Sequence, residues 1–156
     1  QTATPIDPDE TAPELYERLA RMGAELLVQV VAELAAGTAS RTPQDHEKAT
    51  LAPMLSKELS PMDWNHTALQ LHNQVRGLLP WPAAVTTLNG SRCKVFATTV
   101  LEEHTQAEPG TILRADKAGI DLACGEGTVL RIDQLQPDGG KRMKAADYLR
   151  GHPIVL

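Results

Sequence analysis

The segment from Pro43 to Trp64, which reads PQDHEKATLAPMLSKELSPMDW, separates two parts of the chain that have different sequence patterns. Its apolar residues follow neither the 3.6-residue repeat of an amphipathic helix nor the two-residue repeat of a half-buried strand. Its prolines exclude a continuous helix and push the residues before them toward extended backbone. We therefore expect an ordered, extended connector over residues 38–60, with a structured part on each side.

Charge also differs on the two sides of the connector. The chain of 156 residues has a formal net charge of −5; residues 1–56 hold nine acids and four bases, and residues 57–156 hold eleven of each. An acidic chain is not a general binder of nucleic acid, because the sequence-independent part of that affinity comes from Lys and Arg side chains that neutralise phosphates. Any nucleic-acid site must therefore be a local basic face.

Residues 11–37 carry the clearest helix signal. Thr11 and Glu14 fit a capping box, and Pro13 falls in the first turn, where a missing N–H is harmless. Gly37 supplies a C-terminal stop. Between them, apolar residues recur at steps of three and four: Leu15, Leu19, Met22, Leu26, Val30 and Leu34. We expect a long amphipathic helix whose broad apolar face needs a partner layer.

After the connector the pattern changes from helix to strand. Residues 68–79 predict a second, shorter helix, and Asn89-Gly90 is typical of a type I′ hairpin turn, because both central positions need positive φ. Residues 145–150 predict a closing helical turn. The expected strands are 85–88, 93–100, 111–115, 120–123 and 128–135. The predicted fold class is α+β: a small antiparallel five- or six-stranded OB-like barrel with flanking helices, preceded by the long amphipathic helix and the extended linker.

Little in the chain suggests catalysis or metal binding. Cys93 and Cys124 lie in strand-like runs without C-x-x-C spacing, so we expect buried thiols in a reducing compartment rather than a disulfide. No set of residues has metal-ligand spacing. The histidines are scattered over connector, helix and loops, which favours structural roles: His46, His66, His72, His104 and His152. Without an apolar stretch of about 20 residues or a signal peptide, the expected location is the cytoplasm.

Five stretches together carry a family resemblance: LAAG, PQDHEKATLAPMLSKE with MDW after it, VRGLLPWPAA, GTILRADKAGIDLACGEGTV and LQPDGGKRMKAADYLRG. In this order and spacing they resemble the C-terminal half of bacterial methionyl-tRNA formyltransferases over essentially the whole chain. The resemblance implies that residues 1–37 are the last helix of a Rossmann-like catalytic domain, residues 38–60 a linker, and residues 61–156 an OB-like tRNA-binding domain. The family's catalytic Asn, His and Asp would lie upstream of Gln1.

The resemblance also implies a reaction and partners. Enzymes of this family transfer a formyl group from 10-formyltetrahydrofolate to methionyl initiator tRNA in translation initiation, so the expected partner is that tRNA and not a membrane. The fragment itself is expected to hold no cofactor. The residues leave two alternatives open: an accessory domain of a related small-molecule formyltransferase or formyl hydrolase, and a purely structural module.

Basic residues of the connector and the second part are the candidates for tRNA contact: Lys57, Arg76, Arg92, Lys94, Lys141, Arg142 and Lys144. For any single one, an ordinary solvated side chain is an equal alternative. The last three are favoured as a cluster, because they follow a Gly-Gly turn that lets the backbone approach a ligand. Met54 stands where many relatives have a second lysine, and Lys144 stands where a Ser or Thr helix cap is usual.

The two tryptophans suggest packing more than base stacking. Trp81 lies between Pro80 and Pro82, so we expect it to pack the second helix against the barrel, with its indole N–H bonded to backbone. Stacking of bases on Trp64 or Trp81 is the less favoured alternative.

We predict that the purified 156-residue chain does not formylate methionyl-tRNA, because none of its residues matches the family's catalytic motifs. The measurement is a formylation assay with 10-formyltetrahydrofolate, and detectable product would contradict the prediction.

We also predict self-association through the apolar stripe of residues 15–34, since an amphipathic helix without a partner layer exposes a sticky face. Sedimentation velocity over a range of protein concentrations tests this expectation. A monomer at high concentration, with the stripe open to solvent, would count against it.

Overall fold

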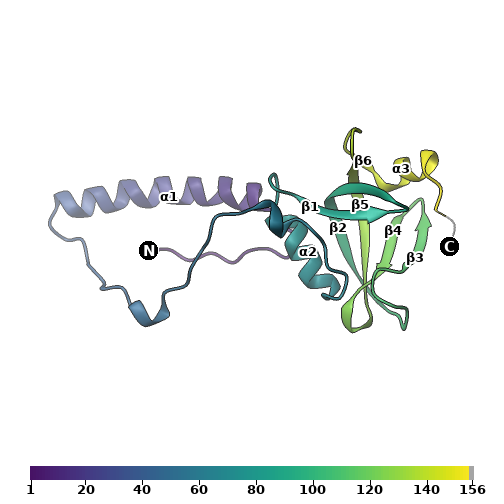
Figure 1. Cartoon of the computed structure of the whole chain (residues 1–156). Helices are drawn as coiled ribbons and strands as arrows, with labels where there is room; N and C mark the ends of the chain where they lie inside the picture. Colours follow the sequence, from purple (N-terminus) through teal and green to yellow (C-terminus); the bar gives the residue numbers. More distant parts are fainter. Residues whose placement is uncertain (155–156) are drawn as a thin grey trace. The chain divides into compact units, whose positions relative to one another are not determined.

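The computed structural model describes residues 1–154 and divides the chain into two compact units, Gln1–Met54 and a second unit that begins at Leu55 (Figure 1). No helix in the described residues is long and apolar enough to cross a membrane.

The first unit is built on helix α1 (Ala12–Ala35). The capping box of Thr11 and Glu14 forms, and the Thr11 N–H donates to the Glu14 carboxylate at 2.8 Å. The hydrogen bond from the Thr11 hydroxyl, and after it the bond from the Thr11 N–H, lower the pKa of Glu14. Arg18 holds the preceding segment, because its guanidinium bonds the Glu10 carboxylate and the Pro5 carbonyl, each at 2.7 Å. After α1, Gly37 adopts a φ of 72° and ends the helix.

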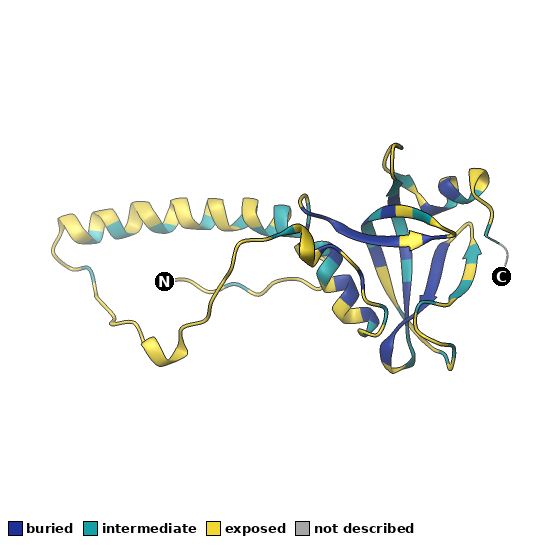
Figure 2. Ribbon diagram, in the orientation of Figure 1, coloured by how far each residue is buried: buried dark blue, intermediate teal, exposed yellow. Residues whose placement is uncertain are grey.

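No residue of α1 is buried in this unit, as the yellow and teal helix in Figure 2 shows. Most of the apolar stripe is half-buried, whereas Leu19 and Leu34 are exposed. Beyond α1, the chain continues without long regular elements; its one short turn here, η1 (His46–Lys48), is capped by the Asp45 carboxylate, which accepts from the Glu47 N–H at 3.1 Å.

In the second unit the described residues form a six-stranded antiparallel sheet. Its strands pair in the order β1-β2-β5-β4-β3, with β6 added beside β5. The elements, in chain order, are η2 (Lys57–Leu59), α2 (Ala68–Gly77), β1 (Ala84–Leu88), β2 (Ser91–His104), β3 (Ile112–Asp116), β4 (Gly119–Ala123), η3 (Gly125–Gly127), β5 (Thr128–Pro137), β6 (Met143–Lys144) and α3 (Ala145–Gly151). The α+β class and the antiparallel strands are confirmed. The pairing is that of an open sheet with β1 and β3 at its edges, so the OB-like barrel stays a prediction.

Local sequence signals explain several of these elements. Asn89 and Gly90 both have positive φ, 47° and 78°, as the predicted hairpin turn requires. Helix α2 begins at a second capping box, in which the Thr67 N–H donates to the Gln70 side chain at 2.8 Å. It ends two residues earlier than residue 79, because Leu78 already has a non-helical backbone as C-cap.

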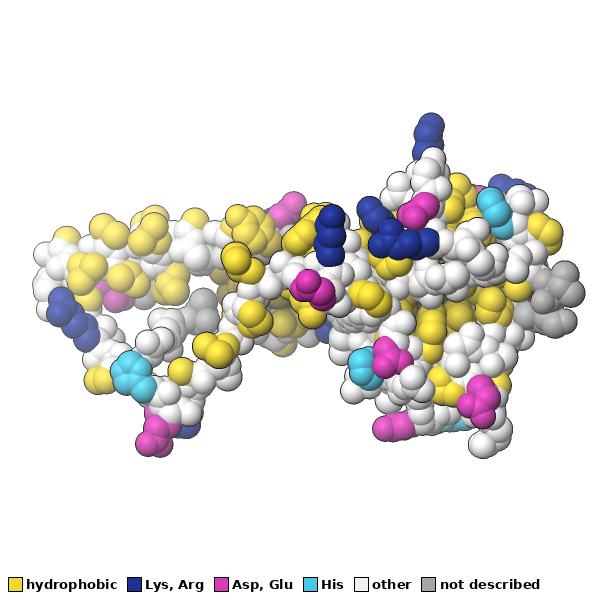
Figure 3. Space-filling view, viewed as in Figure 1, with side chains coloured by type: hydrophobic (Ala, Val, Ile, Leu, Met, Phe, Trp, Pro, Cys, Tyr) yellow, Lys and Arg dark blue, Asp and Glu magenta, His cyan; other side chains and the backbone are white. Residues whose placement is uncertain are grey.

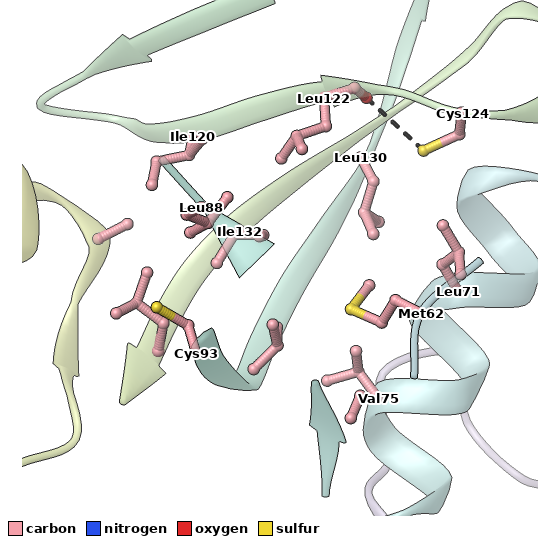
Figure 4. Close-up of a cluster of buried hydrophobic side chains, with 14 of the residues drawn as sticks. Met62, Leu71, Val75, Leu88, Cys93, Ile120, Leu122, Cys124, Leu130 and Ile132 are labelled. Carbon is pink, nitrogen blue, oxygen red and sulfur yellow. Dashed lines mark hydrogen bonds between the residues drawn. The ribbon is translucent and has the colours of Figure 1, made fainter. Parts of the chain in front are cut away.

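The core lies between α2, the sheet and α3. In Figure 4, Leu71 and Val75 of α2 point toward Met62 and the strand residues. From the other side, α3 contributes Ala145 and Tyr148, both at most 1% exposed. The buried strand residues are mainly aliphatic, as expected from a chain with 3% aromatic residues: Leu88, Val95, Ile120, Leu122, Val129, Leu130, Ile132 and Leu135.

The turn before α2 is docked onto the turn before β5. The Gly125 N–H donates to two carbonyls of that turn, Trp64 at 2.9 Å and His66 at 2.8 Å. The Thr128 hydroxyl accepts from the Ala68 N–H and donates to the Gly125 carbonyl, both at 2.8 Å. A Cβ on residue 125 would lie 1.9 Å from the Asn65 carbonyl oxygen, so only glycine permits this approach.

The prediction for Trp81 was wrong. Trp81 is 52% exposed, and the tryptophan that packs against the core is Trp64. The reason is the docked turn: its bonds to Gly125 hold Trp64 over the sheet, next to Gly110, whereas Trp81 lies in the loop between α2 and β1.

We predict that Gly125→Ala lowers the free energy of unfolding by about 2–3 kcal/mol, because the added methyl group forces the two turns apart. Gly77→Ala is the matched control: no atom lies within 4 Å of the added Cβ, and Ala favours a helix over Gly, so stability should stay equal or rise by up to about 1 kcal/mol. Urea denaturation of both variants provides the comparison. Equal midpoints would contradict the steric argument.

Candidate nucleic-acid interface

One outward face of the sheet gathers polar and basic side chains from three strands. Lys94 of β2 lies opposite Gln136 of β5, and Gln134 lies opposite Lys144 of β6. Their neighbours Val95 and Leu135 are fully buried. Because successive side chains of a strand point to opposite faces, Lys94, Gln134, Gln136 and Lys144 point away from the core.

Arg142 is held in place on this face. Its Nε donates to the Gln134 side chain at 3.0 Å, and its guanidinium lies 4.7 Å from the centre of the Phe96 ring. The strand register shifts between Val95 and Ala97, which places Phe96 in a bulge of β2. The cation–π contact is worth about 0.5–1 kcal/mol at an exposed site, and it favours this position of the guanidinium.

Lys141 lies in the turn between β5 and β6, beside Arg142. Gly139 has a φ of 74°, and the Gln136 side chain donates to the Gly140 carbonyl at 2.9 Å, which holds the turn against β5. Figure 3 shows dark-blue Lys and Arg side chains on this projecting turn and on the surface near it. We call Lys94, Lys141, Arg142 and Lys144 the basic face; it includes the predicted cluster after the Gly-Gly turn.

The cations of the basic face have no acidic partners. Within the described part of the chain, no carboxylate forms an ion pair with any of these four residues. Other arginines of the second unit are neutralised. Arg131 bonds the buried Asp121 carboxylate at 2.6 and 2.9 Å, and Arg114 bonds Glu103 at 2.9 Å. Asp121 also raises the pKa of Arg131, through its hydrogen bonds.

Two more predicted residues, Lys57 and Arg92, line a separate cavity of about 540 Å³ beside β1. Lys57 is the first residue of η2, and the Arg92 guanidinium lies 3.6 Å from the Asp138 carboxylate at an exposed position. The structure therefore brings together two residues from the connector and the hairpin. Arg76 lies elsewhere, in the last turn of α2, where its Nε donates to Asn73 at 2.8 Å.

Both cysteines and His72 are buried in the second unit. Cys93 and Cys124 are free and buried, as expected, and burial raises the pKa of the Cys124 thiol to about 11. Burial also raises the pKa of Cys93. His72 is buried, with its Nδ1 3.0 Å from the Thr98 hydroxyl. In residues 1–154, no group of three or more His, Cys, Asp or Glu side chains could hold a metal ion.

Sequence reasoning missed the groups that orient the basic face. Phe96, Gln134 and Gln136 fix Arg142 and the β5–β6 turn, but they carry no charge and no motif. The available signal was Phe96 itself, the one phenylalanine of the chain, which stands two residues after Lys94 on a predicted strand.

Comparison with known proteins gives consistent results. Residues 54–153 match the family model described as formyl transferase, C-terminal domain. The methionyl-tRNA formyltransferase of Bacillus subtilis is 44% identical over 146 residues, which are 94% of this chain and 46% of that protein. The enzyme of the same name from Enterococcus faecalis is 42% identical over 151 residues, 97% of this chain and 48% of that protein. The chain thus spans about half the length of the curated relatives it matches.

Solved structures share the fold at lower identity. HypX from Aquifex aeolicus superposes with a TM-score of 0.67 at 18% identity, over 94% of this chain and 27% of that one. An N-formyltransferase from Helicobacter canadensis gives 0.63 at 15% identity, over 83% of this chain and 46% of that one. Taken with the family match over residues 54–153, these relatives show that the chain belongs to the formyl transferase C-terminal domain family and is similar to the C-terminal regions of bacterial methionyl-tRNA formyltransferases.

Proposed function

We propose that this chain is the tRNA-binding part of a cytoplasmic methionyl-tRNA formyltransferase. The whole enzyme would formylate the amino group of methionyl initiator tRNA, with 10-formyltetrahydrofolate as its formyl donor. The names of the relatives that are 41–44% identical support this proposal. A structure of HypX with tetrahydrofolic acid, from a protein of the same fold, is consistent with a folate donor.

The observation that carries the tRNA-binding proposal is the basic face. In a chain of net charge −5, the basic face gathers four cations that form no ion pair within the described residues, whereas Arg131 and Arg114 are paired with acids. Local charge decides contact with a polyanion, because fields from exposed charges decay within about 8–10 Å at physiological salt. This face is therefore suited to the phosphate backbone of a tRNA stem.

Arrangement matters as well as charge. Phosphate contacts position a nucleic acid without reading its sequence, and they are strongest when the donors are already in place. Arg142 is fixed by Phe96 and Gln134, so less side-chain entropy is lost when it binds a phosphate. In this proposal the basic face positions the tRNA and contributes affinity for it. None of the residues described here has a role in the formyl-transfer step.

The remaining expectations belong to the same proposal. Residues 1–37 would end a catalytic domain, residues 38–60 would be a linker, and residues 61–156 would form the tRNA-binding domain. The exposed positions of α1, such as Leu19 and Leu34, would then be the surface through which the isolated chain self-associates.

We predict that the double variant Lys141→Gln, Arg142→Gln binds tRNA more weakly and with a smaller salt dependence. Each lost phosphate contact should reduce the slope of log K against log salt concentration by about 1. The measurement is a titration with initiator and elongator tRNA at several salt concentrations.

The matched control is Lys48→Gln, Lys117→Gln, which removes the same number of charges from exposed positions outside the basic face. It should leave the slope nearly unchanged. Equal slopes for the two double variants would reject the basic face as the contact surface. Equal affinity for tRNA and for heparin would instead favour a role in a small-molecule formyltransferase.

A further inference from the structure

The cavity beside β1 differs in construction from the basic face. It has a volume of about 540 Å³, within the range of about 300–1,000 Å³ that is usual for sites of small ligands. Lys57 and Arg92 lie at its wall, Trp64 provides an aromatic wall, and none of the residues that line it is acidic. All of these residues belong to the second unit.

A second cavity of the same unit provides a contrast. It has a volume of about 380 Å³ and is lined by Glu108 and Glu126 without any Lys or Arg. A phosphate would be repelled there and attracted beside β1. The contrast supports an anionic ligand for the cavity between Lys57 and Arg92.

The edge of β1 contributes unoccupied peptide groups to this cavity. Residues in antiparallel strands alternate between pairs that exchange hydrogen bonds and pairs that do not. The Val85 N–H donates to the Ser60 carbonyl at 2.7 Å and its carbonyl accepts from the Met62 N–H at 2.9 Å, so both groups of Val85 point away from β2. Thr87 is two residues further along, and its N–H and carbonyl therefore face the same open edge.

The connector leaves this edge before it reaches Thr87. Residues Ser60–Met62 run beside β1 in parallel, but the Asp63 carboxylate then accepts from the Asn65 N–H at 3.0 Å and turns the chain. The following turn is bound to Gly125. Thr87 is exposed and lines the cavity, with no connector strand beside it.

We propose that this cavity, which we call the β1 groove, binds one unpaired nucleotide of the RNA that lies on the basic face. This proposal rests on the proposed tRNA-binding function. It assigns the paired RNA to the basic face and the unpaired nucleotide to the residues of the groove. Lys57 and Arg92 bind the phosphate of the unpaired nucleotide. The peptide groups of Thr87 bond the edge of its base or its ribose hydroxyl, and Trp64 supplies an apolar contact.

An unpaired nucleotide suits the groove better than a paired one. Base edges of an A-form stem are either deep in a narrow groove or on a shallow surface, whereas an unpaired base is free to enter a concave site. Arg92 already has a loose acidic partner, Asp138 at 3.6 Å with both side chains 58% exposed, which a phosphate displaces at small cost.

The test uses the 156-residue chain with two fluorescent probes, a single-stranded RNA hexamer and an RNA hairpin stem. The double variant Lys57→Gln, Arg92→Gln should weaken hexamer binding by about tenfold, and it should change the ratio of hexamer to stem affinity by at least about fivefold. Lys141→Gln, Arg142→Gln should act mainly on the stem. Lys117→Gln, outside both groups, should affect neither probe.

A backbone variant tests the open edge directly. Thr87→Pro removes the N–H that faces the groove, and proline is tolerated at edge positions whose N–H points away from the partner strand. It should weaken hexamer binding, while Thr87→Val, which keeps the N–H, should not. In the NMR spectrum of the native chain, the hexamer should shift the Thr87 amide and Trp64 indole signals.

The outcomes separate the two proposals. Stem binding without hexamer binding would overturn the groove proposal and leave the tRNA-binding proposal standing. The groove proposal would also be overturned if the Lys57, Arg92 variant lost affinity equally for the hexamer and the stem, or if the Thr87 and Trp64 signals did not shift. A peptide strand added to β1 would then become the better assignment. Failure to bind either RNA would reject both proposals.

Discussion

The contact between Gly125 and the turn that precedes α2 positions most of the second unit. The Gly125 N–H donates to the Trp64 and His66 carbonyls. The Thr128 hydroxyl accepts from the Ala68 N–H, the first of α2, and donates to the Gly125 carbonyl. Ala68 is completely buried, so its N–H would cost about 1–3 kcal/mol if it lost the Thr128 hydroxyl. One close backbone approach thus fixes where α2 begins, where Trp64 packs and where the connector leaves β1.

In the second unit, the buried carboxylate of Asp121 is paired with arginines, whereas the cations of the basic face are not buried. The buried Asp121 is bonded by Arg131 and approached by Arg114 at 3.4 Å, because an unpaired charge at that position would be strongly unfavourable. The four cations of the basic face, which form no ion pair within residues 1–154, need no such compensation, because none of their side chains is buried. This difference explains how a unit with equal numbers of acids and bases presents a basic face.

Local signals in the sequence predicted the parts of the fold that neighbouring residues determine. Asn89-Gly90, the cap at Thr11 and the alternating strands depend on a few adjacent residues, and the structure has them where expected. The cap at Thr67 is equally local, but it was not predicted. Features that depend on contacts between distant segments were missed. The two-residue strand β6 is too short to show a period, and the role of Gly125 depends on Asn65, sixty residues earlier in the chain.

In the candidate site, too, local signals were predictable and contacts between distant segments were not. Lys141 and Arg142 were recognisable as candidates because they follow a Gly-Gly turn. The position of the Phe96 ring beside Arg142 depends on a β-bulge in β2, which no local sequence pattern predicts. Trp81 was assigned to the core because of its flanking prolines, but the docked turn gives that position to Trp64. The grouping of Lys57 with Arg92 required the connector's path along β1, which strand periodicity does not specify.

That path explains how the C-terminal end of the connector is held although the segment has no period of its own. Ser60 and Met62 bond Val85 on one side, and on the other side the Gln74 side chain of α2 donates to the carbonyls of Leu59 and Pro61, at 2.8 and 3.0 Å. In this bridge the backbone nitrogen of residue 61 points away from β1, so a proline at this position removes no hydrogen bond to β1. The missing N–H also prevents a further strand from pairing on that side. Lys57 lies in the short helical turn immediately before these bonds. Its place at the β1 groove is therefore set by the sheet and α2, not by the flexibility of a linker.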